Sequence, residues 1–312
     1  DSVIGGAGTD SFDFDSYVTS TTAVGGSGND TFVFANTVTG AYVSGDADKD
    51  SIVFSEVVNG GTSIMGGAGN DTLSFGNGAT SVSIAGGTGV DSIAFSGAQV
   101  ANSTIDLGSD ADVFSLTIGA SASTIMGGAN NDTLVFSAQE LTSSSVSGGD
   151  GNDSIYFASE LESGSSINGG AGADTLYFSA GVTGSAVSAG LGADSVVFNG
   201  VVSNATVTGS NAADSLVFSA NADVVSFDGS IGAGSIVGGS GADSLVFLSG
   251  AEIGAGTIRG GAGADSIEFD GNLVSGVFAG DAGNDAFTGS ISVGAGGVSF
   301  WGGSGADTFT FT

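Results

Sequence analysis

The pattern of apolar and polar positions repeats along the whole chain with a period of about 21 residues. In each of 15 copies an Asp is followed two residues later by a large apolar residue. Four residues after the Asp stands Phe in 13 copies, and Leu116 and Gly289 are the exceptions. Since alternation with a period of two is typical of a strand with one buried face, the pattern predicts a short strand after each of these Asp residues.

A second strand is expected before each Gly-rich turn. Its apolar residue lies two positions before the turn, as Ile64 and Ile84 do, and a Ser or Thr usually precedes it. A variable segment, such as residues 96–103, completes the repeat. Each repeat is therefore strand, Gly-rich turn, strand and variable turn.

A unit this small cannot bury its apolar face alone, and stacking of identical coils solves the problem. Each strand then pairs in parallel with its own copy one coil later. The sequence predicts an all-β fold: one continuous parallel β-solenoid (a β-roll or β-helix) over residues 1–312, with about 15 coils. At about 4.8 Å per coil it would be roughly 70 Å long. The columns of apolar residues argue against the two alternatives, a Gly/Ser-rich linker and a β-sandwich.

One interval departs from the period. Asp214 and Asp243 are 29 residues apart, whereas the other intervals are 20 to 22 residues. We expect the extra residues, within 219–237, to form an irregular coil or an outward bulge while the row of turns continues. Both ends have plain repeat sequence, which favours an excerpt of a longer repeat protein; end-to-end stacking into fibres is the alternative.

Composition narrows the possible functions. The chain has 59 Gly, no Pro, no Cys and no His, and its only basic residues are Lys49 and Arg259 against 33 acidic ones, for a net charge of −31. Nucleic acid and anionic membranes are therefore not expected as partners, because both require Lys and Arg. Without His or Cys the chain can build neither a Ser-His-Asp or Cys-His centre nor a common zinc site, which predicts a protein that is not an enzyme. No apolar run approaches the length of a membrane span.

The Gly-rich turns have the chemistry of a cation site. Glycines bring backbone carbonyls close together and the Asp adds a carboxylate, so the donors are all oxygen. Flexible coordination by oxygen alone suits Ca²⁺ better than Mg²⁺. In a solenoid these carboxylates would stack one strand spacing apart, where two charges repel by about 1 kcal/mol in water and about 3.5 kcal/mol at an effective dielectric constant of 20. Cations between the turns would remove this repulsion.

The turns GGAGND (66–71), GGDGND (148–153) and GGSGAD (302–307) resemble the RTX nonapeptide repeat, GGxGxDxUx, in which U is a large apolar residue. The resemblance covers the whole chain. Many RTX β-rolls carry the motif on both edges of the coil, whereas here one copy occurs per coil. This is similar to the single-edge solenoids of some bacterial surface-layer proteins and adhesins, including an ice-binding adhesin region.

The resemblance implies Ca²⁺ between successive turns, up to about 14 ions. For the gap between turns 66–71 and 86–91 it implies carbonyl ligands from Gly66, Ala68, Gly87 and Gly89. Lower occupancy is expected in the degenerate turns 45–50, 107–112, 127–132 and 209–214. The implied carboxylate ligands are Asp10, Asp30, Asp50, Asp71, Asp91, Asp112, Asp132, Asp153, Asp174, Asp194, Asp214, Asp243, Asp265, Asp285 and Asp307.

The leading hypothesis is a non-enzymatic extracellular structural protein: part of a surface layer, filament or adhesin that folds on export when it meets Ca²⁺. Self-association, end to end or side by side, would fit such a role. The resemblance further implies secretion from a Gram-negative organism, for example a cyanobacterium. Two alternatives remain: a face of an adhesin that binds a ligand or ice, and the accessory module of a secreted RTX enzyme.

Overall fold

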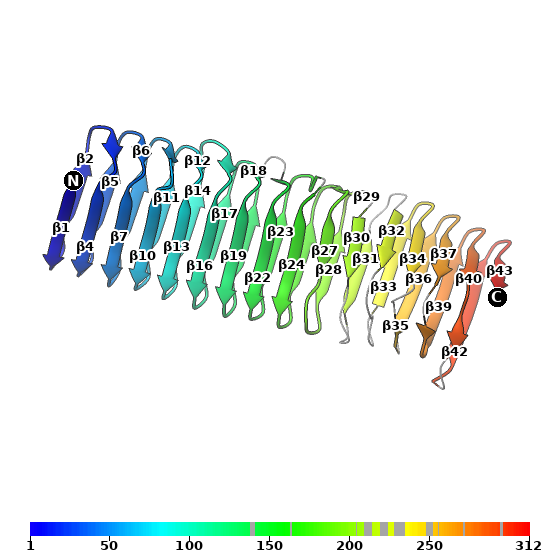
Figure 1. The fold of residues 1–312 in the computed structure, drawn as a ribbon. Helices are drawn as coiled ribbons and strands as arrows, with labels where there is room; N and C mark the ends of the chain where they lie inside the picture. The colour runs from blue at the N-terminus through cyan, green and yellow to red at the C-terminus, as the bar shows by residue number, and fades with distance from the viewer. Residues whose placement is uncertain are drawn as a thin grey trace. The chain divides into compact units, whose positions relative to one another are not determined.

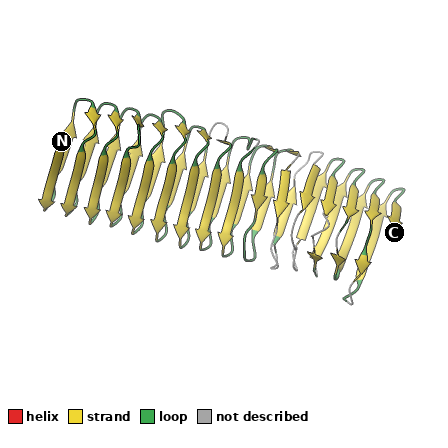
Figure 2. Cartoon of the chain, in the orientation of Figure 1, coloured by secondary structure: helices red, strands yellow, loops and turns green. Residues whose placement is uncertain are grey.

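The computed structural model describes residues 1–137, 141–162, 164–203, 205–208, 214–218, 224–227, 235–247, 252–254, 256–270, 272–293 and 296–312. Its secondary structure in these ranges is strand and turn (Figure 2). The described residues contain no helix that is long and apolar enough to cross a membrane. The chain divides into two compact units, Asp1–Ser154 and Ile155–Thr312.

In the first unit, every repeat forms one coil with three strands (Figure 1). The strands before the Gly-rich turns form one parallel sheet: β1 (Ser2–Ala7), β4 (Thr22–Ser27), β7 (Tyr42–Ala47), β10 (Ser63–Ala68), β13 (Ser83–Thr88), β16 (Thr104–Ser109), β19 (Thr124–Ala129) and β22 (Ser145–Asp150). The strands after the turns form the second: β2 (Ser11–Phe14), β5 (Thr31–Phe34), β8 (Ser51–Phe54), β11 (Thr72–Phe75), β14 (Ser92–Phe95), β17 (Val113–Leu116) and β20 (Thr133–Phe136).

A narrow third sheet covers the other edge of the coils in this unit. Its two-residue strands are β3 (Val18–Thr19), β6 (Val38–Thr39), β9 (Val58–Asn59), β12 (Ala79–Thr80), β15 (Val100–Ala101), β18 (Ala120–Ser121) and β21 (Leu141–Thr142). The first residue of each of these strands is buried. This apolar residue of the variable segment therefore closes the core at that edge.

The register of the sheets places identical columns on top of one another. Leu73 pairs with Ile52 on one side and Ile93 on the other, and all three side chains are fully buried. The rings of Phe54, Phe75 and Phe95 stack at centroid distances of 5.1 and 4.4 Å. The parallel β-solenoid predicted from the sequence is therefore confirmed, with the Phe column inside it.

The second unit continues the same coil type. One of its sheets contains β24 (Ser166–Ala171), β27 (Ala186–Ser188), β30 (Ala205–Thr208), β32 (Val224–Phe227), β34 (Ser244–Phe247), β37 (Ser266–Phe269), β40 (Ala286–Gly289) and β43 (Thr308–Phe311). The other contains β23 (Ser154–Phe157), β25 (Thr175–Phe178), β28 (Ser195–Phe198), β31 (Ser215–Phe218), β33 (Ser235–Ser240), β36 (Gly256–Ala262), β39 (Gly276–Ala282) and β42 (Val298–Ser304). Its short edge strands are β26 (Val182–Thr183), β29 (Val202–Ser203), β35 (Glu252–Ile253), β38 (Asn272–Leu273) and β41 (Ser292–Val293).

The two strand types exchange sheets in the middle of this unit. Up to β30 the first sheet holds strands that precede Gly-rich turns, but from β34 onward it holds strands that follow them. The second sheet changes in the opposite sense between β31 and β33. Of the segment expected to be a bulge, residues 219–237, the structure describes β32 and the first three residues of β33, while residues 219–223 and 228–234 lie outside the described residues.

The exchange is possible because both strand types present the same alternation. Ser215, Leu216 and Val217 of β31 pair with Ser235, Ile236 and Val237 of β33. Leu216 and Ile236 are both fully buried. A strand that precedes a turn can therefore extend a sheet of strands that follow turns without exposing the core.

Candidate metal sites in the glycine-rich turns

The Asp that ends each Gly-rich turn lies inside the molecule. Thirteen of the 15 are only 1–2% exposed, and Asp10 and Asp307 are half-buried. Because an ionised carboxylate loses its hydration on burial, such a row needs compensating partners. The buried members are Asp30, Asp50, Asp71, Asp91, Asp112, Asp132, Asp153, Asp174, Asp194, Asp214, Asp243, Asp265 and Asp285.

One carboxylate oxygen has a regular partner. The backbone N–H of Asp71 donates to Oδ1 of Asp91 in the next coil at 2.7 Å, and the N–H of Asp91 donates to Oδ1 of Asp112 at 2.6 Å. The same bond joins Asp243 to Asp265 at 2.9 Å. The sequence predicts that such residues lie one above another, and these hydrogen bonds fix the orientation of each carboxylate toward its neighbour in the next coil.

The other oxygen, Oδ2, is buried and has no hydrogen-bond partner in many of the described turns. An unsatisfied buried acceptor costs about 1–3 kcal/mol, and more when it is charged. A repeated orphan atom of this kind indicates a ligand, because native structures satisfy nearly all buried polar atoms. The clearest cases are Asp10, Asp30, Asp50, Asp71, Asp91, Asp112, Asp132, Asp194, Asp265 and Asp285.

The first glycine of each turn keeps space open beside this oxygen. A Cβ built on Gly66 would lie 2.6 Å from Oδ2 of Asp71 and 2.6 Å from the carbonyl oxygen of Gly86. At Gly260, a Cβ would lie 2.4 Å from Oδ2 of Asp265. The turn therefore leaves an oxygen-lined gap between coils that a side chain would fill.

The direction of each backbone carbonyl shows which gap between coils its oxygen borders. These directions change the set of carbonyls expected between turns 66–71 and 86–91. The carbonyl oxygens of Gly67 and Gly69 lie 1.9 and 2.2 Å from Cβ positions built on Gly87 and Gly89, so both point toward the next coil. The carbonyl of Thr88 points back and accepts a hydrogen bond from the N–H of Gly69 at 2.7 Å.

The gap between turns 66–71 and 86–91 is therefore bordered by carbonyls of Gly67, Gly69, Gly86 and Thr88. The expected carbonyls belong to other gaps: that of Gly66 lies 2.6 Å from the Cβ position on Gly45, and that of Gly87 lies 2.1 Å from the Cβ position on Gly108. By the same alternation, the carbonyl of Ala68 points in the same direction as that of Gly66, and the carbonyl of Gly89 points in the same direction as that of Gly87. Successive carbonyls point in opposite directions along a parallel strand, which is the physical reason for the correction. That these oxygens bind metal remains a prediction.

The degenerate turns keep the backbone conformation of the others. Where glycine is missing at a position with positive φ, Asp or Asn stands instead, and these residues tolerate that region best. The cases are Asp46 (φ 76°), Asp48 (75°), Asp110 (84°), Asn130 (77°) and Asp281 (74°). The loss of a glycine from turn 127–132 therefore does not change the path of the chain, and residues 209–213 lie outside the described part.

Two turns differ at the first position instead. Leu107 and Ala189 stand where the other described turns have glycine, and both side chains are fully buried. Each adds a Cβ at the place that borders the open gap elsewhere. We therefore expect weaker cation binding beside Asp112 and Asp194.

Burial raises the pKa of the column carboxyls. The pKa of Asp91, Asp112 and Asp132 rises to about 7, and that of Asp50 and Asp194 to about 6. Burial is the largest cause and neighbouring carboxylates add to it, while the hydrogen bond from the backbone N–H acts in the opposite direction. Near neutral pH the fold therefore disfavours the ionised column unless a cation accompanies it.

The donor set fits a hard divalent cation. Each gap between described turns offers carboxylate and carbonyl oxygens, and the chain has no His or Cys that could add a nitrogen or sulfur ligand, which matches Ca²⁺. In the described residues, no cluster of three or more His, Cys, Asp or Glu side chains is able to hold a metal, so a cation in these gaps would need backbone carbonyls as ligands.

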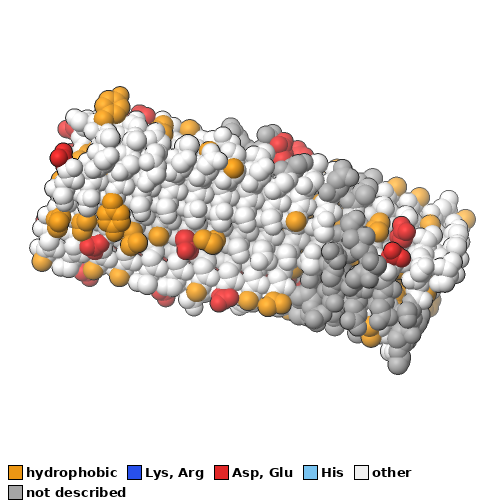
Figure 3. Space-filling model, viewed as in Figure 1, with side chains coloured by type: hydrophobic (Ala, Val, Ile, Leu, Met, Phe, Trp, Pro, Cys, Tyr) orange, Lys and Arg blue, Asp and Glu red, His pale blue; other side chains and the backbone are white. Residues whose placement is uncertain are grey.

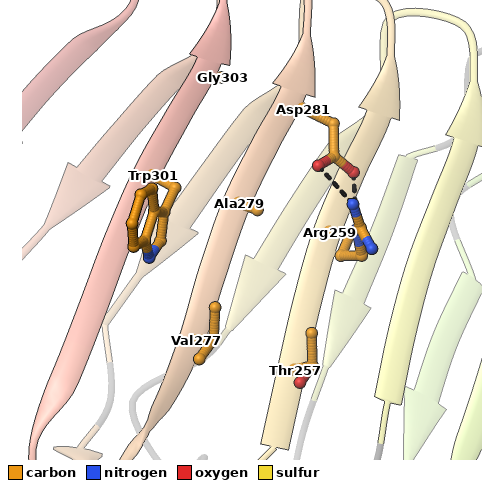
Figure 4. A pocket seen from close by; sticks show the side chains of 7 residues that line it. All are labelled: Thr257, Arg259, Val277, Ala279, Asp281, Trp301 and Gly303. Carbon is orange, nitrogen blue, oxygen red and sulfur yellow. Dashed lines mark hydrogen bonds and ion pairs between the residues drawn. The ribbon is translucent and has the colours of Figure 1, made fainter.

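A shallow depression of about 370 Å³ lies elsewhere, on the outer face of β36, β39 and β42 (Figure 4). Arg259 donates to both carboxylate oxygens of Asp281 at 2.8 Å, and the ring of Trp301 is 65% exposed. Arg259, Ala279 and Trp301 occupy equivalent positions in three successive repeats, so the register of the repeat is the sequence signal that aligns them.

Six segments of the chain match a known family of calcium-binding repeats. The RTX calcium-binding nonapeptide repeat family (four copies) matches residues 59–82, 119–139, 144–159, 165–182, 252–271 and 289–311. A solved structure, a hyperactive, Ca²⁺-dependent, β-helical antifreeze protein from an Antarctic bacterium, is 18% identical, with a TM-score of 0.43, over 92% of this chain and 84% of that one. No curated protein matches the chain. The matched segments carry RTX calcium-binding nonapeptide repeats, and together with the parallel β-solenoid they support an RTX-type calcium-binding β-roll repeat protein.

Proposed function

We propose that this chain is a non-enzymatic extracellular structural protein, part of a surface layer, filament or adhesin, whose solenoid is folded and stiffened by rows of Ca²⁺ between stacked turns. The observation that carries the proposal is the repeated buried Oδ2 atom without a partner, beside a gap that glycine keeps open. RTX repeats are typical of secreted proteins, which supports an extracellular location.

The ion would supply positive charge where the fold stacks carboxylates. Between turns 66–71 and 86–91, Asp71 and Asp91 would hold it with the four carbonyls that border the gap. The backbone N–H groups of the Asp residues orient the carboxylates, and the glycine at the first position of each turn leaves room for the ion. In low calcium, repulsion and desolvation oppose stacking, so the binding energy of Ca²⁺ becomes folding energy after export.

Circular dichroism during a calcium titration of a chelator-treated sample at neutral pH tests the proposal. A change from a disordered to a β spectrum that chelator reverses is expected, with Mg²⁺ much less effective. A full β spectrum in excess chelator would refute the role of calcium in folding.

A second candidate, recognition of a ligand on an outer face, rests on the depression at Trp301. An exposed aromatic ring and an Arg that line the same depression are residue types enriched at interfaces. Ice is a less suitable ligand for the face in Figure 3, on which apolar and acidic side chains interrupt the surface irregularly. Absence of thermal hysteresis would exclude ice binding, and sequencing of the flanking regions would test the accessory-module alternative.

A further inference from the structure

The sheet exchange in the second unit changes the edge on which the Gly-rich turns lie. Turn 189–194 takes the chain from the sheet of β27 to the sheet of β28. Turn 238–243 takes it in the opposite direction, from the sheet of β33 to the sheet of β34. Because all strands within each sheet are parallel, these two passages occur at opposite edges of the coil (Figure 1).

Hydrogen bonds mark where the first row of turns stops. The N–H of Ser215 donates to the carbonyl of Asp194 at 2.7 Å, which joins consecutive members of that row. In the next coil the donor to the carbonyl of Asp214 is Ser235, at 2.6 Å. Ser235 begins β33, a strand that precedes a turn, so the neighbour of Asp214 on that edge is not Asp243.

A second row begins on the opposite edge. The N–H of Asp243 donates to Oδ1 of Asp265, and that of Asp265 to Oδ1 of Asp285, both at 2.9 Å. Asp285 donates in the same way to Asp307 at 3.0 Å. Oδ2 of Asp265 and of Asp285 is buried without a partner, and Cβ positions on Gly260 and Gly280 would lie 2.4 and 2.1 Å from them. The second row thus has the same hydrogen bonds between Asp residues, buried Oδ2 atoms and open gaps beside glycine as the first.

We propose that the calcium sites of the second unit form two separate rows on opposite edges of the solenoid, one ending at Asp214 and the other beginning at Asp243. No ion bridges Asp214 and Asp243, so the two rows load independently. The proposal rests on the calcium role given above. Its consequence is that the second unit carries calcium on one edge of its coils up to Asp214 and on the opposite edge from Asp243 onward.

Disulfide crosslinking tests the exchange without depending on calcium ligands. The chain has no Cys, so the two introduced Cys residues can form a disulfide within the chain only with each other. Val217 pairs with Val237 across the exchange, and Val197 pairs with Val217 in the coil before it. Adjacent parallel strands bring Cα atoms to about 4.8 Å, within the range of a disulfide.

Val217→Cys with Val237→Cys should crosslink as fully as the control pair Val197→Cys with Val217→Cys. Val217→Cys with Val246→Cys should not, whereas a row of turns that continues on one edge would pair these two positions. Efficient crosslinking of Val217→Cys with Val246→Cys, or none with Val237→Cys, would overturn the exchange.

Calcium titrations of Asn variants then test independent loading. For Asp265→Asn and Asp285→Asn, which would share an ion, the fold-change in the calcium midpoint of the double variant should differ from the product of the single fold-changes. For Asp214→Asn and Asp243→Asn it should equal the product. Coupling within the second pair would refute separate rows, and a wild-type chain that folds without calcium would instead refute the proposed function.

Discussion

Acid should substitute for calcium in folding this chain. The perturbation is a rise in pH in the presence of chelator. In the fold, the pKa of five column carboxyls, those of Asp50, Asp91, Asp112, Asp132 and Asp194, is about 6 to 7, against an ordinary value of 3.8. Between pH 4 and pH 7 the folded state therefore holds protons that the unfolded chain has released, so stability falls as the pH rises.

The magnitude follows from the number of groups. One proton of difference changes the stability by about 1.4 kcal/mol per pH unit, so five groups give an upper limit of about 7 kcal/mol per pH unit. Interacting carboxyls titrate in succession, and we expect about half of this slope. Since a domain is stable by about 5–15 kcal/mol, the calcium-free fold should be lost within a few pH units.

The assay is circular dichroism against pH, with and without calcium. In chelator, the β signal should be present near pH 5 and lost by about pH 7 to 8. In calcium the trend should reverse, because protons compete with the ion for the carboxylates. Asp91→Asn should retain the calcium-free fold to higher pH while raising the calcium requirement. A calcium-free β signal that is flat across this window, or that grows as the pH rises, would refute the reasoning.

The remaining predictions concern single sites. Gly66→Ala should raise the calcium midpoint more than it weakens the acid-folded form, because its Cβ enters the gap beside Asp71, while Leu107 and Ala189 show that the coil accepts a Cβ at this position; equal loss in both forms would contradict this. Gly67→Ala should destabilise both forms by about 1–3 kcal/mol in urea unfolding, since φ is +123° and its Cβ would meet the carbonyl of Asp46; an unchanged midpoint would show that the backbone relaxes. Phe75→Ala should cost about 3–5 kcal/mol by removing a fully buried ring from the stack, and Phe75→Leu only about 1 kcal/mol, as Leu116 occupies the same column; a loss for Phe75→Leu as large as that for Phe75→Ala would show that only an aromatic ring fits this place.

The sequence by itself determined the coil. The alternation around each Asp, the Phe column and the fixed period allow only stacking in parallel, because one repeat cannot bury its apolar face. It also determined the composition of the metal sites, since Gly carbonyls and Asp are the only donors that the turn contains. The confirmed solenoid and the RTX repeats follow from residues that lie close together in the chain.

Only the tertiary structure decided which atoms share a gap. The direction of each carbonyl depends on strand pairing. For this reason the carbonyls of Gly86 and Thr88, and not those of Gly66 and Ala68, face the gap between turns 66–71 and 86–91. The tertiary structure also decided on which edge of the coil each row of Gly-rich turns lies. Two strand types with the same alternation are interchangeable in sequence terms, so the interval of 29 residues fits a bulge as well as an exchange of sheets. Hydrogen bonds between coils distinguish the two, and these join residues that are separated by a full repeat.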